Sequence, residues 1–254
     1  MGRKYILTDE TFEISGCTLH RIKAVRDFGN VCKGELGGFI QSENNLSHEG
    51  DAWVYHNAKV YGEAIVYDDA VVYDDARVHG NTRVYNNAAV FGNADVYDNA
   101  EVYADAMVYN NTKVYGNAEV YDNAAVFGHA EVYGNAEVYG NAKVFDNAEV
   151  YGNADVYGNA EIYGCADVYD KADVYGDAYI CGDAEVSSKE DYIVFKNWWS
   201  SGRYFTWTRS NDKWRVGCFY GNGKKLVDKS YRDSDASGRE YQRIVEYVES
   251  IKKK

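Results

Sequence analysis

The residues best suited to acid–base chemistry in this chain are three of its five histidines, His56, His79 and His129. Histidine serves as a general base because its pKa lies near neutrality, provided that a partner orients the ring beside a substrate pocket. His129 lies in Gly-His-Ala where neighbouring segments read Gly-Asn-Ala, so we interpret it as a substitution within a repeated motif. The sequence predicts no catalytic residue.

Other short motifs give little support for phosphate or metal chemistry. The stretch GNGKK at residues 221–225 lacks the full spacing and the Ser or Thr of a phosphate-binding loop. Two acidic pairs, at 68–69 and 74–75, fall on different expected corners of a repeat, which argues against a shared calcium ion. The five cysteines are odd in number and match no zinc spacing. We expect no cofactor, no metal and a reduced, cytoplasmic protein.

A six-residue repeat contains the three histidines and both acidic pairs. From Val54 to Val186 every sixth residue is Val or Ile, which gives 23 hexads without an insertion. Ala precedes each by two residues, except at Thr82 and Thr112. Alternation places Ala and Val on one face of a short strand, and the following Gly, Asp or Asn pair suits a sharp corner. Copies must stack to bury that face, and the absence of proline fits a fully paired backbone.

This pattern resembles the hexapeptide-repeat, left-handed β-helix proteins over residues 51–187. The resemblance implies a mainly β fold with three strands per coil, nearly eight coils and a left-handed path. The N-terminal motifs LTDET, LHRIKA, DFG and GELGG are similar to those of transferase-like members from gut bacteria and their phages. The family is best known for acyltransferases that use coenzyme A, a His near the junction of adjacent helices, and loops extruded from the coils. No loop interrupts these hexads, so acyl transfer is the alternative rather than the leading function.

Segments of different composition flank the repeat. Within residues 1–50, KYILT and TLHRIKAV predict a hairpin cap that leads into an irregular first coil. Within residues 188–254, DYIVFKNWW, RYFTWTR and KWRVGCFYG predict three antiparallel strands. A helix is expected from about Ser237 to Lys252 with a buried apolar face. That face comprises Tyr241, Ile244, Val248 and Ile251. We expect a small β-β-β-α domain, termed the head below.

The three sides of the predicted solenoid differ in their outward residues. Each hexad presents two outward residues, the one between Ala and Val and the one after Val, which is usually Tyr or Phe. We number the sides from the hexad of Val54, and side one alone gathers apolar residues at both outward positions. We call this set the apolar strip: Val71, Ala89, Phe91, Met107, Ala125, Phe127 and Phe145. Such a grouping predicts a buried contact. We favour association of two copies into a homodimer, with packing of the terminal segments over side one and chance clustering as alternatives.

Charge is also segregated along the chain. Residues 51–187 carry 24 acidic and 6 basic residues, whereas residues 188–254 carry 9 acidic and 15 basic residues. Side three presents an acidic column: Glu101, Glu119, Glu137, Asp155 and Asp173. The column either keeps a repetitive rod soluble or imitates the charge of a nucleic acid. Candidate contacts on the basic head are Trp198, Trp199, Arg203, Arg209, Lys213 and Arg215.

These patterns predict a non-catalytic binding scaffold that contacts an unknown protein through its flat sides and head. A phage-type inhibitor of a host defence or nucleic-acid-handling protein would suit the acidity and the resemblance. Direct contact of the head with nucleic acid stays open. No run of about 18 apolar residues indicates a membrane span, so no membrane partner is expected.

Overall fold

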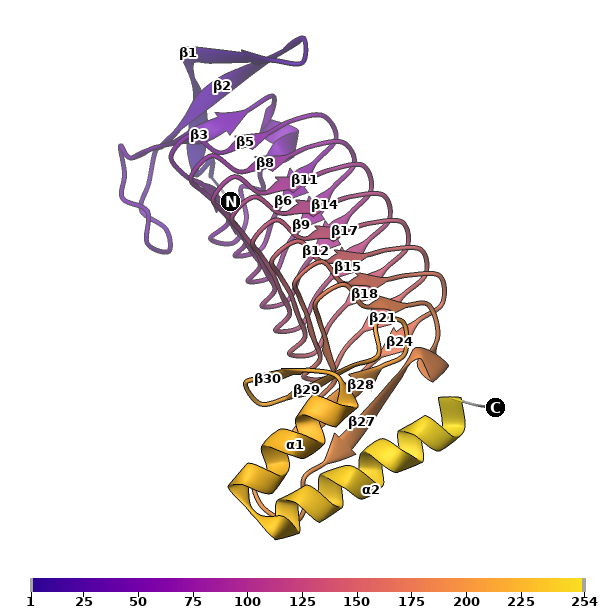
Figure 1. Ribbon diagram of the computed structural model, residues 1–254. Coiled ribbons are helices and arrows are strands. Elements are labelled where there is room, and N and C mark those ends of the chain that lie inside the picture. The colour runs from indigo at the N-terminus through magenta and orange to yellow at the C-terminus, as the bar shows by residue number, and fades with distance from the viewer. Residues whose placement is uncertain (1, 253–254) are drawn as a thin grey trace.

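The computed structural model describes residues 2–252 and shows a three-sided solenoid with a hairpin at one end and the head at the other (Figure 1). Each hexad contributes a two-residue strand that pairs in parallel with the strand 18 residues away, as in Ala89 opposite Met107. Three hexads therefore complete one coil, and the mainly β, parallel β-helical fold is confirmed.

The strands of each side form one sheet. Side one comprises β4 (Trp53–Val54), β7 (Val71–Val72), β10 (Ala89–Val90), β13 (Met107–Val108), β16 (Ala125–Val126), β19 (Lys143–Val144), β22 (Glu161–Ile162) and β25 (Tyr179–Ile180). Side two comprises β5 (Lys59–Val60), β8 (Arg77–Val78), β11 (Asp95–Val96), β14 (Lys113–Val114), β17 (Glu131–Val132), β20 (Glu149–Val150), β23 (Asp167–Val168) and β26 (Glu185–Val186). Side three comprises β6 (Ile65–Val66), β9 (Arg83–Val84), β12 (Glu101–Val102), β15 (Glu119–Val120), β18 (Glu137–Val138), β21 (Asp155–Val156) and β24 (Asp173–Val174).

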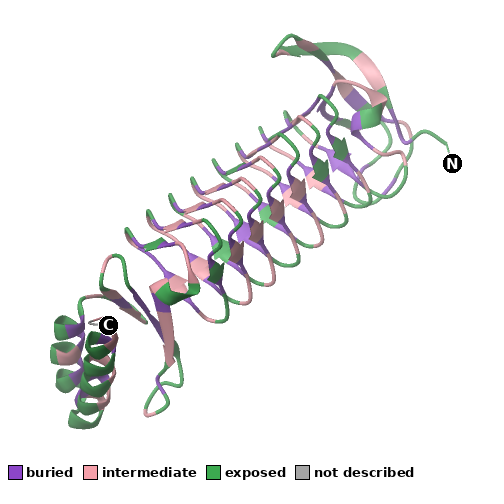
Figure 2. Cartoon of the chain, turned by 90° about the vertical axis from the view of Figure 1, so that its right-hand side faces the viewer, coloured by how far each residue is buried: buried purple, intermediate pink, exposed green. Residues whose placement is uncertain are grey.

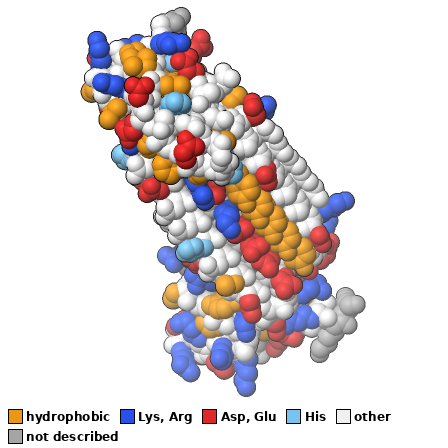
Figure 3. All heavy atoms as spheres, turned by 90° about the horizontal axis from the view of Figure 1, so that it is seen from above, with side chains coloured by type: hydrophobic (Ala, Val, Ile, Leu, Met, Phe, Trp, Pro, Cys, Tyr) orange, Lys and Arg blue, Asp and Glu red, His pale blue; other side chains and the backbone are white. Residues whose placement is uncertain are grey.

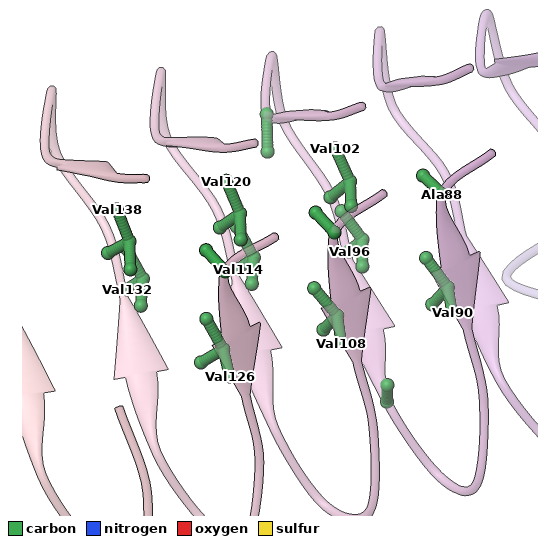
Figure 4. Packing of buried hydrophobic residues seen from close by; sticks show 14 of the residues in the cluster. Ala88, Val90, Val96, Val102, Val108, Val114, Val120, Val126, Val132 and Val138 are labelled. Carbon is green, nitrogen blue, oxygen red and sulfur yellow. The ribbon is translucent and has the colours of Figure 1, made fainter. Parts of the chain in front are cut away.

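The solenoid interior is a narrow column of alanine and valine (Figures 2 and 4). The Ala and the Val or Ile of each hexad are buried, which confirms the expected register. The two threonines that replace Ala are buried as well. Their hydroxyls donate to the carbonyls of His79, at 2.6 Å, and Tyr109, at 2.7 Å. These bonds satisfy the only polar atom that each substitution brings into the interior.

Corners turn through left-handed backbone, which limits the residue types that fit there. Gly134 has φ of 76°, and a Cβ at this position would lie 2.9 Å from the carbonyl oxygen of Gly152 in the next coil. Asp122 holds the equivalent position with φ of 56°. Short polar residues and glycine tolerate this conformation best, which explains the Gly, Asp or Asn at the corners other than those of His56 and Ala104.

The N-terminal segment closes the first coil. Strand β1 (Tyr5–Ile14) pairs with β2 (Cys17–Ala24), and β3 (Leu36–Ile40) joins β2 to β5 of side two. A short 3₁₀ turn, η1 (Glu43–Asn45), follows β3. The buried ammonium group of Lys4 donates to the carbonyl of Ala52 at 2.8 Å, and burial lowers the Lys4 pKa to about 8. The side-chain amide of Asn45 donates to the carbonyl of Ala64 at 2.8 Å. Both groups satisfy carbonyls that no preceding coil can reach.

The head contains more elements than the sequence predicts. After η2 (Lys189–Asp191), the described residues form β27 (Tyr192–Lys196), β28 (Tyr204–Thr208), β29 (Lys213–Val216), β30 (Phe219–Gly221), α1 (Gly223–Asp233) and α2 (Asp235–Lys252). The expected third strand splits into β29 and β30 because Gly217 turns the chain with φ of 56°. The GNGKK stretch begins α1, where the Asn222 side chain accepts from the backbone N–H of Lys225 at 2.9 Å. In α2, Tyr241 and Val248 are buried, whereas Ile244 and Ile251 are partly buried.

The head closes the last coil. Thr206 Oγ1 accepts a hydrogen bond from the backbone N–H of Tyr179 at 2.9 Å, and Ser210 Oγ accepts from that of Glu185 at 2.7 Å. The other face of the head sheet packs on the helices through Phe205, Trp207 and Trp214. Neither of the helices described has the length and apolarity needed to span a bilayer.

Candidate binding faces of the solenoid and head

The three histidines lie on the solenoid surface. His79 stacks between Tyr61 and Tyr97, with ring centroids 4.7 and 5.3 Å apart. Its Nε2 lies 3.1 Å from a carboxylate oxygen of Asp95 in the next coil. His56 is an exposed corner residue whose Nδ1 lies 3.2 Å from Asp74. These carboxylate partners escaped the sequence analysis because they lie 16 and 18 residues ahead.

The surroundings of these histidines suit a structural role. Neighbouring rings cover both faces of His79, and His56 has φ of 51° at its corner. His129 is exposed, and its backbone N–H donates to the carbonyl of Asp146 at 2.6 Å. Within residues 2–252, the pockets described below are lined by other residues. The contacts of all three histidines join one coil to the next.

The acidic pairs of the first coils are corner residues. The Asp68 carboxylate accepts from the Asn86 side chain at 3.0 Å, and that of Asp74 lies 3.3 Å from the backbone N of Gly92. Both bonds join one coil to the next. Among residues 2–252, no group of three His, Cys, Asp or Glu side chains is placed to hold a metal ion.

Aromatic side chains form a ladder on each side. On side three, successive rings from Tyr67 to Tyr175 stack with centroids 4.8–5.4 Å apart and planes within 16° of parallel. On side one, rings from Tyr73 to Tyr163 stack at 4.7–4.9 Å. Stacked rings at this spacing stabilise neighbouring strands by direct contact.

The acidic column is bonded to the ladder on side three. Glu101 accepts a hydrogen bond from the Tyr85 hydroxyl at 3.1 Å, and Glu137 accepts one from Tyr121 at 2.8 Å. Glu119 accepts from Tyr103 at 2.9 Å in the same way. Desolvation, together with the neighbouring glutamate, raises the pKa of these tyrosines well above its ordinary value. The column is therefore part of a hydrogen-bonded surface as well as a row of like charges.

The two aspartates of the column are too short to reach the tyrosine hydroxyls, because their side chains have one methylene fewer than glutamate. Among the described residues, neither Asp155 nor Asp173 receives a bond from the tyrosine 16 residues before it. Desolvation first, and the charges of Glu137 and Asp173 next, raise the pKa of Asp155.

Side one has no such hydrogen-bonded column, and its two ends are covered by the chain itself. Trp53, in the first coil, is buried against Tyr5 and Phe28, with ring centroids 6.0 and 5.3 Å away. In the seventh coil, the Arg215 Nε donates to the hydroxyl of Tyr163 at 2.5 Å. The terminal segments thus reach the ends of side one but not its middle.

The apolar strip occupies that middle. Met107 is 42% exposed and projects between two small residues, Ala89 and Ala125, of which Ala125 is only 7% exposed. Phe91, Phe127 and Phe145 are half-buried in the side-one ladder. The space-filling view shows how the solenoid surface segregates side chains of one kind into continuous rows along the rod (Figure 3).

The head residues singled out from the sequence have different surroundings. Trp198 is 73% exposed, whereas Trp199 packs edge-on against Tyr241 with ring centroids 4.9 Å apart. Arg209 is bonded to the carbonyl of Glu190 at 3.2 Å, and Lys213 lies in β29 opposite Thr208.

Arg203 and Arg215 come together in a pocket of about 440 Å³ where the head meets the last coil. Tyr204 and Asp177 also line it, and sequence analysis missed both. Only the docking of the head on the solenoid brings these four residues together.

Comparison with known proteins adds no function to this geometry. No protein-family profile matches the chain, and no curated protein shows significant sequence similarity to it.

Proposed function

We propose that this protein is a non-catalytic binding scaffold whose main contact face is the apolar strip of side one. One observation carries the proposal: over the middle coils of side one, one outward column holds Val71, Ala89, Met107 and Ala125 and the other holds Phe91, Tyr109 and Phe127. These residues lie between two ends that the chain's own terminal segments cover. Hydroxyl–carboxylate pairs or charged residues occupy the equivalent columns of sides two and three. An outward apolar surface of this length favours contact with a protein.

The first partner that this strip fits is a second copy of the chain. A two-fold contact presents the same strip from both copies, so that Met107 of one copy meets small residues of the other. The strip covers about five coils, which at about 4.8 Å between strands gives roughly 20 Å along the rod. Such a contact forms a modest, concentration-dependent dimer rather than an obligate one.

Light scattering at tens of micromolar tests this proposal. The unmodified protein should be dimeric, and the double variant Met107→Glu, Phe127→Glu should be monomeric with an unchanged circular dichroism spectrum. Ile65→Glu is the matched control, because Ile65 is 39% exposed at the equivalent outward position of side three. That control should stay dimeric. If the unmodified protein is monomeric, the dimer is wrong and the strip contacts a partner other than a second copy.

We further propose that the acidic sides two and three contact a protein with a basic surface in the cytoplasm, in the manner of a phage-type inhibitor of a host nucleic-acid-handling or defence protein. Support comes from the acidic column and from five cysteines that form no disulfide in the described part of the chain. Affinity capture from the native host, with and without nuclease, tests it. The double variant Glu119→Gln, Glu137→Gln keeps oxygen acceptors for the Tyr103 and Tyr121 hydroxyls. The amount of partner protein captured by this variant should therefore fall through loss of charge alone.

A further inference from the structure

The aromatic ladder of side three ends at an open ring. Tyr175 is its last member, stacked on Tyr157 with ring centroids 5.4 Å apart, and it is 50% exposed. The ladder of side one ends differently, because Arg215 bonds to its last ring, Tyr163. Tyr175 lines a pocket of about 470 Å³ between the last coil and β27. A planar ring that entered this pocket would continue the ladder by one step.

The pocket beside Tyr175 joins the arginine pocket described above. Both are lined by Asp177 and Tyr204, so the two pockets adjoin at these residues along the junction of head and solenoid, and together they are called the depression below. Figure 1 shows strands β27 and β28 of the head close to β24 and the end of the solenoid. Alternation along β28 explains the lining: Tyr204 and Thr206 face the solenoid, whereas Phe205 and Trp207 face the helices.

Basic groups without acidic partners surround this depression. Lys189 lines the part beside Tyr175, and Arg203 and Arg215 line the other part. Within residues 2–252, none of the three forms an ion pair with a carboxylate. The Tyr163 hydroxyl accepts a hydrogen bond from the Nε–H of Arg215, so the other four guanidinium N–H groups can donate to a ligand. Asp177 is the one carboxylate among the residues that line the two parts, and it accepts from the Asn159 side chain at 3.2 Å.

We propose that this depression binds a nucleotide, with the base stacked on Tyr175 and the phosphate held by Arg203 and Arg215. An aromatic face in one pocket, with two guanidinium groups that have no carboxylate partner among the described residues in the adjoining pocket, matches a planar base joined to a phosphate, because arginine binds phosphate with paired donors. Volumes of about 440 and 470 Å³ fall in the range of small-ligand sites. A duplex keeps its bases stacked inside, so only a free nucleotide or an unpaired base of a single strand has the required chemistry. The site is separate from the apolar strip, and its test does not depend on the dimer.

Fluorescence anisotropy and calorimetry with the full chain distinguish the two sources. The probes are AMP, UMP, a single strand of about ten thymidines, the corresponding duplex, and inorganic phosphate. Saturable binding of a mononucleotide identifies a free nucleotide as the ligand, and binding of the single strand alone identifies an unpaired strand. The proposal is wrong if neither binds, or if the duplex or inorganic phosphate binds as tightly as the best nucleotide probe.

Substitutions then locate the binding site. Arg203→Gln, at an exposed position, and Tyr175→Leu should each weaken binding about tenfold, the order expected for loss of a charge-assisted phosphate bond or a stacked base. Matched controls on α2, Arg243→Gln and Tyr247→Leu, should leave binding unchanged. Melting curves verify that each variant is folded. Equal affinity of the Tyr175 and Tyr247 variants would overturn the assignment.

Discussion

Sides one and three of the solenoid share an interior and differ only on the outside. Both bury the small residue and the Val or Ile of every hexad, with Thr82 the one replacement of Ala on side three, and both carry a stacked aromatic ladder. On side three each tyrosine from Tyr85 to Tyr121 donates a hydrogen bond to a glutamate of the next coil. The middle of side one instead presents Ala89, Phe91, Met107, Tyr109, Ala125 and Phe127. The interior and the ladders therefore determine stability, and the outward columns determine what each side can contact.

A charged residue in the interior should destabilise the protein equally on all three sides, and this is the largest effect that we expect. Val126→Asp on side one, Val132→Asp on side two and Val138→Asp on side three each place an unpaired carboxylate in a dry column (Figure 4). Each should lower the free energy of unfolding by about 4 kcal/mol or more. Urea unfolding measures this change. Near-normal stability of any one variant would contradict the register on that side.

Alkaline pH should destabilise the folded protein through the tyrosines that donate to glutamates on side three. The pKa of Tyr121 in the folded state lies above its ordinary value of 10.0, because of desolvation and the bond to Glu137. The folded state thus binds this proton more tightly than the unfolded state, so its contribution to stability is fully present below pH 10 and decreases as pH rises further. Circular dichroism should show unfolding above pH 10.

Tyrosine removal sharpens that comparison. Tyr121→Phe removes a hydroxyl bonded to a carboxylate, whereas Tyr109→Phe on side one removes a hydroxyl without a carboxylate partner among the described residues. The first variant should therefore lose more of the alkaline dependence of stability than the second. Identical alkaline transitions in both variants would show that the glutamate bond contributes nothing.

Charge on side three should have the smallest effect on stability. Glu137→Gln keeps an acceptor for the Tyr121 hydroxyl and relieves repulsion with Glu119 and Asp155, its neighbours in the sheet. Glu137→Lys relieves the same repulsion but loses the acceptor. We expect the glutamine variant to be slightly more stable than the lysine variant, with both within about 0.5 kcal/mol of the unmodified protein. Thermal melting in low salt measures the difference.

Much of the solenoid is predictable because its repeat is local. The spacing of Val and Ala specifies the interior, and Gly, Asp or Asn at most corners specifies the turns. The bond from Tyr85 to Glu101 was not predicted, because it requires knowing that the glutamate 16 residues ahead lies in the next coil beside the hydroxyl. An alignment of the repeat in rows of 18 residues would place Glu101 beside Tyr85 in the next coil.

The head was less predictable because its arrangement depends on tertiary contacts. Basic and polar residues dominate the segment that forms α1, and Leu226 is its one large apolar side chain that is fully buried, so few apolar residues mark the helix in the sequence. Asn222 is its clearest start signal. The two pockets, one beside Tyr175 and one beside Arg203, form where Thr206, Ser210 and Tyr192 hydrogen-bond the head to the end of the solenoid. No spacing in the sequence encodes that docking.

The central claim, that side one rather than side three is the contact face, is tested most directly by spin labels at matched positions. Met107→Cys and Ile65→Cys carry the label at equivalent outward positions, in a background where the exposed Cys32, Cys165 and Cys218 are replaced by Ser. Pulsed dipolar spectroscopy at tens of micromolar should show strong coupling between copies for the Met107→Cys label and weak coupling for the Ile65→Cys label. Absence of coupling from Met107→Cys, or equal coupling from both positions, would contradict the account.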